Sequence, residues 1–103
     1  MRMGPFPLYV RRTFFDAFAI GAKTIEYRLH RGRFAARTFW PGREVSIRYR
    51  YDATSPRLVA HVAHFEIAPL AQLDPAIGEV LASIYPDIAD HTEIALIHLA
   101  LSR

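Results

Sequence analysis

Alternation of apolar and polar residues along the chain predicts most of its strands. Between residues 24 and 29 the two kinds of residue take turns, which sends them to opposite faces of a strand. The apolar set is Ile25, Tyr27 and Leu29, and the polar set is Thr24, Glu26 and Arg28. The same period recurs in residues 44–51. Residues 8–10 and 58–67 are apolar runs rich in strand formers, and residues 93–101 are apolar on both faces, as in a central strand.

Two short helices are predicted between these strands. Phe14, Phe15 and Phe18 are spaced to share one buried helical face, with Thr13 as the expected N-cap and Gly21 as the expected stop. The second helix begins with an N-cap aspartate followed by proline, Asp74-Pro75, and ends before Pro86.

The resulting order is strand, helix, strand, strand, strand, helix, strand, without repeats or a linker. Residues 1–103 are therefore expected to form a single domain. The fold class is α+β, mainly β. We expect a small, closed or nearly closed five-stranded β-barrel with two short helices flanking a cleft.

Charge is distributed unevenly over the chain. Residues 1–57 carry twelve basic and four acidic side chains, whereas residues 58–103 carry one basic and six acidic side chains. Such a basic half favours an anionic partner, most often nucleic acid. An arginine-rich composition that fills ordinary surface positions would give the same excess, so this alternative stays open.

The expected location is the cytoplasm. The chain has no cysteine, and Met1–Arg12 lacks the apolar core and cleavage site of a signal peptide. The longest apolar runs are too short to span a bilayer, so no membrane partner is expected.

The segment Gly21-x-Lys23-x-x-Glu26-x-Arg28, at the turn from a helix into a strand, resembles the signature of the ASCH family. The turn Pro41-Gly42-Arg43 resembles the one that opens the next strand in that family. The resemblance implies a barrel like that of the PUA RNA-binding domains, with a cleft lined by Lys23, Glu26 and Arg28. It also implies RNA or nucleoside binding.

Some small bacterial ASCH proteins are hydrolases that deacetylate N4-acetylcytidine or cut single-stranded RNA. By this resemblance Lys23 and Glu26 are the candidate catalytic residues. In the amidohydrolase the position of Glu26 is a threonine, and the catalytic acid comes from a longer helical region. Glu79 is the helix carboxylate that this chain offers in its place.

Lys23 is the only lysine of the chain, and three roles are open to it. As a charge clamp, Lys23 would grip a phosphate or a base carbonyl together with Arg28. As a base or nucleophile, it would need a pKa lowered toward neutrality by burial and by nearby cations. Without a function, Glu26 and Arg28 would form a surface ion pair worth under about 1 kcal/mol, and Lys23 would be solvated.

A wider set of residues is expected around this cleft. The predicted ligand-binding residues are Lys23, Thr24, Glu26, Arg28 and Trp40, with Trp40 as a stacking platform. A basic rim that follows a phosphate backbone would consist of Arg11, Arg12, Arg31, Arg33, Arg48 and Arg50. Tyr27 and Tyr49 are expected in the core.

No metal site and no cofactor are expected. His61 and His64 are three residues apart in a predicted strand and should face opposite sides of it. His98 is expected as a hydrogen-bonded core histidine. Phosphate-binding glycine loops and nucleophile-elbow motifs are missing from the sequence.

Three functions follow from these residues. The first is a binding module for single-stranded RNA or a modified nucleoside. The second is a hydrolase that acts on the same class of ligand. The third is a protein-interaction domain with a vestigial site, which applies if Trp40 or Phe39 closes the cleft.

Overall fold

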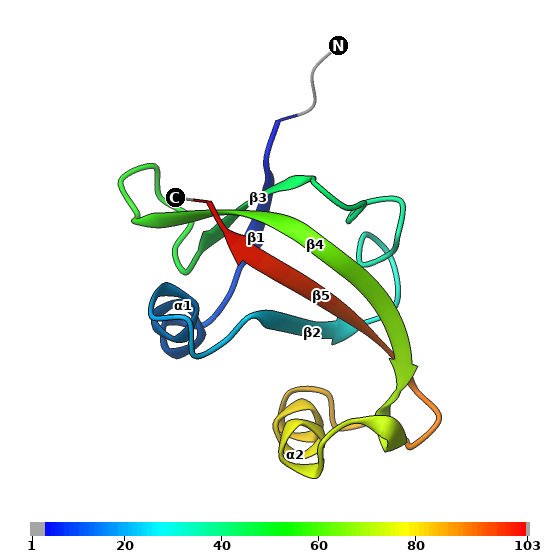
Figure 1. The fold of residues 1–103 in the computed structure, drawn as a ribbon. Helices are drawn as coiled ribbons and strands as arrows, with labels where there is room; N and C mark the ends of the chain where they lie inside the picture. Colours follow the sequence, from blue (N-terminus) through cyan, green and yellow to red (C-terminus); the bar gives the residue numbers. More distant parts are fainter. Residues whose placement is uncertain (1–3, 103) are drawn as a thin grey trace.

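The computed structural model describes residues 4–102 as one five-stranded sheet with two short helices (Figure 1). The elements are β1 (Phe6–Tyr9), α1 (Arg12–Ala19), β2 (Ile25–Leu29), β3 (Glu44–Arg48), β4 (Arg57–Pro69), a single 3₁₀ turn (Leu70–Gln72), α2 (Pro75–Ile84) and β5 (Glu93–Leu101). The predicted order of strands and helices is confirmed. Within residues 4–102, no helix combines the length and the apolar character needed to cross a membrane.

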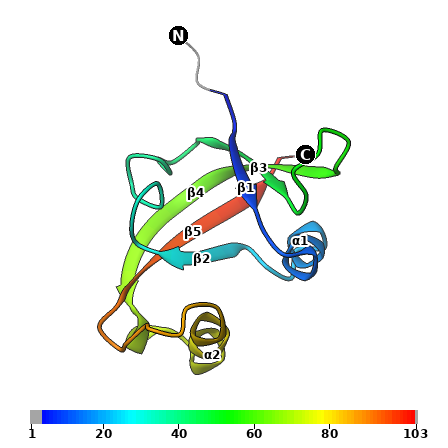
Figure 2. The same ribbon diagram turned by 180° about the vertical axis from the view of Figure 1, so that it is seen from behind.

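The strands lie in the order β1-β3-β4-β5-β2. β1 and β3 are parallel, and every other pair is antiparallel. The sheet curls into a half-barrel, with both helices beside β2 in the two opposite views (Figures 1 and 2). The prediction of a mainly β, α+β fold is confirmed. The expected closure is absent from the strand ladders of residues 4–102, because β1 and β2 are the two edges of the sheet.

The central strand β5 carries apolar residues on both faces, as predicted, and each face builds its own core. The core face of the sheet is the one that carries Ile97 and Leu99, which pack with residues of β1, β3 and α1. The α2 face is the opposite one. It carries Ile94 and Leu96, which pack against Leu81 of α2.

A bulge at Ala63 shifts the phase of β4. Val62 pairs with Leu99 and His64 pairs with His98, so Ala63 is an extra residue between two consecutive pairs. His61 and His64 consequently lie on the same face of the sheet, because their partners on β5 are two residues apart. The prediction that they face opposite sides is wrong, since it assumed an unbroken alternation.

The starts and ends of several elements differ from the predicted ones. α1 begins at Arg12 without a side-chain cap, so the predicted N-cap at Thr13 is wrong. Its first backbone hydrogen bond already runs from Phe15 to Arg11, which makes Thr13 part of the first turn. The predicted cap of α2 is confirmed, because the Asp74 carboxylate accepts a hydrogen bond from the Ala76 amide at 2.8 Å.

Candidate functional site

A pocket of about 460 Å³ opens at the free edge of β2, between β1, α1 and α2. Its size suits a small ligand such as a nucleoside. One wall is apolar and comes mainly from α2, and the polar end comes from β2 and the turn before it. The lining residues are Tyr9, Val10, Arg11, Phe14, Lys23, Glu26, Tyr27, Arg28, Ala76, Ile77, Val80, Leu81, Ile84 and Tyr85.

The end of α1 brings Lys23 to this pocket. Gly21 follows the helix with a φ of 79°, a left-handed conformation that glycine adopts without steric cost. The chain then turns back, and the Lys23 amide donates to the Ala17 carbonyl at 3.1 Å. The predicted stop at Gly21 is confirmed, and the backbone of Lys23 is fixed to the last turn of the helix.

Glu26 lies between the two cations of the predicted motif. Arg28 Nε donates to Glu26 Oε2 at 2.6 Å, and Lys23 Nζ lies 3.5 Å from Glu26 Oε1. The side chains of Lys23, Glu26 and Arg28 are 18%, 6% and 20% exposed. The structure therefore brings all three side chains together at a largely buried position. The alternative, in which Glu26 and Arg28 form a surface ion pair and Lys23 is solvated, is wrong.

Lys23 also satisfies a backbone acceptor on the free edge of β2. The Thr24 carbonyl accepts a hydrogen bond from the backbone of β5, so the next carbonyl, that of Ile25, points away from the sheet. Lys23 Nζ donates to this Ile25 oxygen at 2.6 Å. An edge carbonyl that would otherwise need water is thus paired within the protein.

Arg28 pairs with a backbone carbonyl on the opposite edge strand of the sheet, β1. Val10 donates its amide to Arg48 of β3, which leaves the Tyr9 carbonyl pointing away from β3. An Arg28 Nη atom donates to this Tyr9 oxygen at 2.7 Å. The Arg28 side chain therefore joins β2 to β1 where the backbone does not close the barrel.

Hydrogen-bond donors remain for a ligand after these contacts. The Lys23 ammonium has three N–H groups, and two have acceptors in Ile25 and Glu26. The Arg28 guanidinium has five, and its hydrogen bonds to Glu26 and Tyr9 use two of them. The polar end of the pocket is therefore rich in donors and positively charged, and it suits a carbonyl or phosphate oxygen.

Burial lowers the pKa of Lys23 below its usual 10.5. The Glu26 carboxylate opposes this by raising the pKa, and the Arg28 guanidinium adds a smaller lowering. The folded protein therefore binds this proton less tightly than the unfolded chain does. The contribution of Lys23 to the free energy of unfolding rises with pH between its lowered pKa and 10.5.

Aromatic rings surround the same ammonium group. Lys23 Nζ lies 5.1 Å from the ring centroid of Phe14, 5.3 Å from that of Phe18 and 5.2 Å from that of Tyr27. At this range the rings attract a cation and also exclude water from it. Burial raises the pKa of Tyr27, and the negative charge of the Asp74 carboxylate raises it further. The phenol therefore stays protonated and can donate a hydrogen bond.

Two of the predicted ligand-binding residues lie outside the pocket. Thr24 is exposed, and Trp40 stands in the loop after β2, with its ring 4.6 Å from the guanidinium carbon of Arg43. Phe39 is fully buried in the core. Neither Trp40 nor Phe39 is among the described lining residues, so the cleft is not closed in the way that the protein-interaction alternative required.

The six predicted rim arginines do not form one rim. Arg48 is the last residue of β3 and Arg50 follows it, whereas Arg31 and Arg33 follow the end of β2. The strand pairings put these two ends at opposite ends of the sheet. Arg12 and Arg50 lie 3.4 Å from Asp16 and Asp52, respectively. Of the six, Arg11 alone is among the described residues of the pocket wall.

Sequence reasoning expected helices beside the cleft but did not identify the α2 residues that line the pocket. Val80 lies in the wall although it is 43% exposed, and Ile77, Leu81 and Ile84 lie beside it. The available signal was an apolar residue at position 80, next to the stripe that packs on the sheet. Glu79, the carboxylate offered by the family resemblance, is exposed and outside the described lining.

The described lining residues give the pocket one carboxylate and no histidine, a set that does not hold a metal ion. In the comparisons with known proteins, no family model matches the chain, and no curated protein matches it significantly. The resemblance to the ASCH family therefore stays a prediction.

Titration of Lys23 tests the environment of this site. The NMR signal of its Cε group should titrate below 10.5, because burial disfavours the charged form. Glu26→Gln should lower this pKa further by removing the carboxylate that raises it, and Arg28→Met should raise it by removing a like charge. No other lysine obscures the signal. A wild-type pKa at or above 10.5 would contradict the burial of Lys23.

Proposed function

We propose that the protein is an ASCH-type, PUA-like domain that binds a nucleoside or a base of single-stranded RNA in the pocket beside β2. The observation that carries this proposal is the meeting of Lys23, Glu26 and Arg28 at one end of a pocket of about 460 Å³ whose other wall is apolar. A base needs both kinds of surface, because its faces are apolar and its edges carry hydrogen-bonding groups.

The charge of the site supports a ligand rich in oxygen acceptors. Lys23 and Arg28 outnumber the one carboxylate, and the exposed Arg11 adds a third cation to the pocket lining. The free N–H groups of Lys23 and Arg28 would donate to a base carbonyl, and Arg11 would contact a phosphate. Tyr9, Tyr27 and Tyr85 provide aromatic surface in the pocket lining.

A hydrolase of the same class of ligand is the second candidate, and the lowered pKa of Lys23 favours it. A neutral lysine can take a proton from water as the water attacks a carbonyl carbon. The resulting ammonium can pass that proton to the amide nitrogen as the C–N bond breaks, so that the amine and a carboxylate leave. Glu26, at 3.5 Å from Nζ, would hold the protonated lysine in place. An amide-linked acyl group on a base, as in N4-acetylcytidine, is the corresponding substrate.

Ligand binding should depend on Lys23. Cytidine, cytidine monophosphate and a short single-stranded RNA are titrated into the protein, and amide NMR shifts are followed. We expect shifts at the pocket residues and a loss of affinity of about tenfold or more in Lys23→Met, the cost of roughly one charged hydrogen bond. Arg57→Ala is the matched control, because Arg57 is exposed on β4 and outside the described lining.

Unchanged affinity in a folded Lys23→Met would remove Lys23 from the site, and shifts at residues far from the pocket would contradict its location. Arg11→Ala separates the two phosphate-bearing ligands from cytidine. It should weaken the phosphate-bearing ligands and reduce the salt dependence of RNA binding, while the affinity for cytidine stays unchanged.

Lys23→Arg separates binding from catalysis. Arginine keeps the positive charge but does not lose its proton near neutral pH, so it can clamp a ligand and cannot act as a base. If the site only binds, Lys23→Arg should retain affinity within a few fold, and no N4-acetylcytidine should be consumed by the wild type. Turnover by the wild type that disappears in Lys23→Arg would establish the hydrolase.

A further inference from the structure

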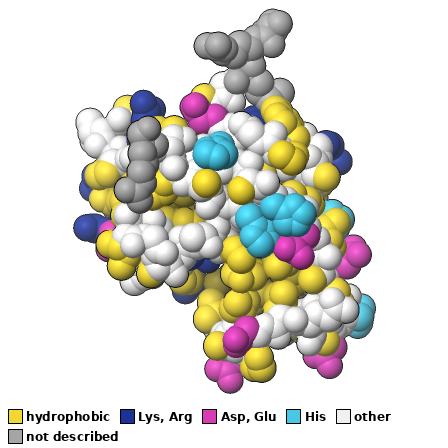
Figure 3. All heavy atoms as spheres, viewed as in Figure 1, with side chains coloured by type: hydrophobic (Ala, Val, Ile, Leu, Met, Phe, Trp, Pro, Cys, Tyr) yellow, Lys and Arg dark blue, Asp and Glu magenta, His cyan; other side chains and the backbone are white. Residues whose placement is uncertain are grey.

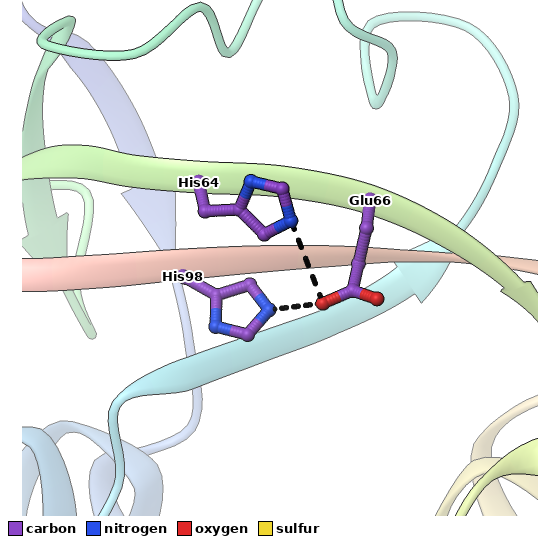
Figure 4. Close-up of side chains that lie close together, drawn as sticks. All are labelled: His64, Glu66 and His98. Carbon is purple, nitrogen blue, oxygen red and sulfur yellow. Dashed lines mark hydrogen bonds and ion pairs between the residues drawn. The ribbon is translucent and has the colours of Figure 1, made fainter.

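His64, Glu66 and His98 form a compact group on the α2 face of the sheet. Figure 4 shows His64 and Glu66 on β4 and His98 on β5, with both imidazole rings turned toward the Glu66 carboxylate. His98 Nε2 lies 2.7 Å and His64 Nε2 lies 3.8 Å from Glu66 Oε2. The space-filling view shows histidine and acidic side chains gathered on this side of the molecule (Figure 3).

The sheet itself creates this arrangement. His64 and His98 are direct cross-strand partners, and Glu66 lies two residues further along the same face of β4. The bulge at Ala63 sets this phase, because it determines which face His64 and the residues after it occupy. Two paired strands hold ligands more rigidly than a loop does, which favours a preorganised site.

The ligand atoms have the spacing that a metal ion needs. One nitrogen of each histidine and one oxygen of Glu66 all lie within 4.8 Å of one another. Bonds of about 2.0–2.2 Å to a tetrahedral Zn²⁺ place neighbouring ligand atoms about 3.3 Å apart. Small rotations of the three side chains therefore suffice to surround one ion.

We propose that His64, Glu66 and His98 bind one divalent transition-metal ion, for which Zn²⁺ is the best match. Two imidazoles and one carboxylate form a ligand set that suits zinc and also Fe(II). The three side chains are 62%, 44% and 28% exposed, so an ion can enter from solvent and keeps at least one position open to water or a further ligand.

This site is separate from the pocket beside β2. None of His64, Glu66 and His98 is among the described lining residues of that pocket. The metal proposal is therefore independent of the nucleoside proposal, and either can fail without affecting the other. The competing explanation is a pair of surface contacts between histidines and a carboxylate, which needs no ion.

Zinc titration of the chelator-treated full chain distinguishes these explanations. Calorimetry should give one Zn²⁺ per chain for the wild type, with affinity reduced at least about tenfold in His98→Ala. Affinity should also fall from about pH 7.5 to about pH 5.5, because imidazole binds a metal in its neutral form. Co²⁺ in place of Zn²⁺ should give the visible absorption bands of a bound ion.

His61→Ala is the matched control, since His61 is exposed on the same face of β4 but is not part of the group. This variant should bind Zn²⁺ like the wild type. If His98→Ala does not fold, His64→Ala replaces it, because His64 is the most exposed of the three residues. Equal zinc affinity in the wild type and in the folded ligand variant would overturn the proposal, and so would binding that His61→Ala abolishes.

Discussion

The burial of the Glu26 carboxylate between two cations is the constraint on which the candidate site depends. A carboxylate that is 6% exposed needs partners, and Lys23 and Arg28 supply them from either side. The same cations pair with carbonyls on the facing edges of the sheet, Ile25 of β2 and Tyr9 of β1. One small network thereby neutralises a buried charge, joins the two edges and forms the polar end of the pocket.

This double role shapes how the site can act. Each oxygen of the Glu26 carboxylate contacts one of the two cations, and the side chain is only 6% exposed, so the carboxylate positions the cations rather than meeting a ligand itself. The cations keep free N–H groups and their positive charge. A ligand would therefore meet donors held in place by the fold, which reduces the ordering cost of binding.

The pattern of apolar and polar residues predicted much of this structure, because their alternation indicates a strand and their helical spacing indicates a helix from neighbouring residues alone. It predicted the order of the elements, the helix stop at Gly21 and the shared strand face of Glu26 and Arg28. That Lys23 joins them in a cleft was expected from the resemblance to the ASCH family. The pattern did not predict which residues of α2 line the pocket, because that depends on how a distant helix packs against β2. It also missed the bulge at Ala63, because one inserted residue reverses the faces of a strand without a composition signal.

A double-mutant cycle tests the central network most directly. Urea unfolding is measured for the wild type, Glu26→Gln, Arg28→Met and the double variant. Each variant is expected to lose free energy of unfolding relative to the wild type. If the buried carboxylate and the guanidinium stabilise each other, the sum of the losses in the two single variants should exceed the loss in the double variant by more than about 1 kcal/mol. Additivity of the two losses within about 0.5 kcal/mol would contradict the account, because it would mean that Glu26 and Arg28 contribute independently.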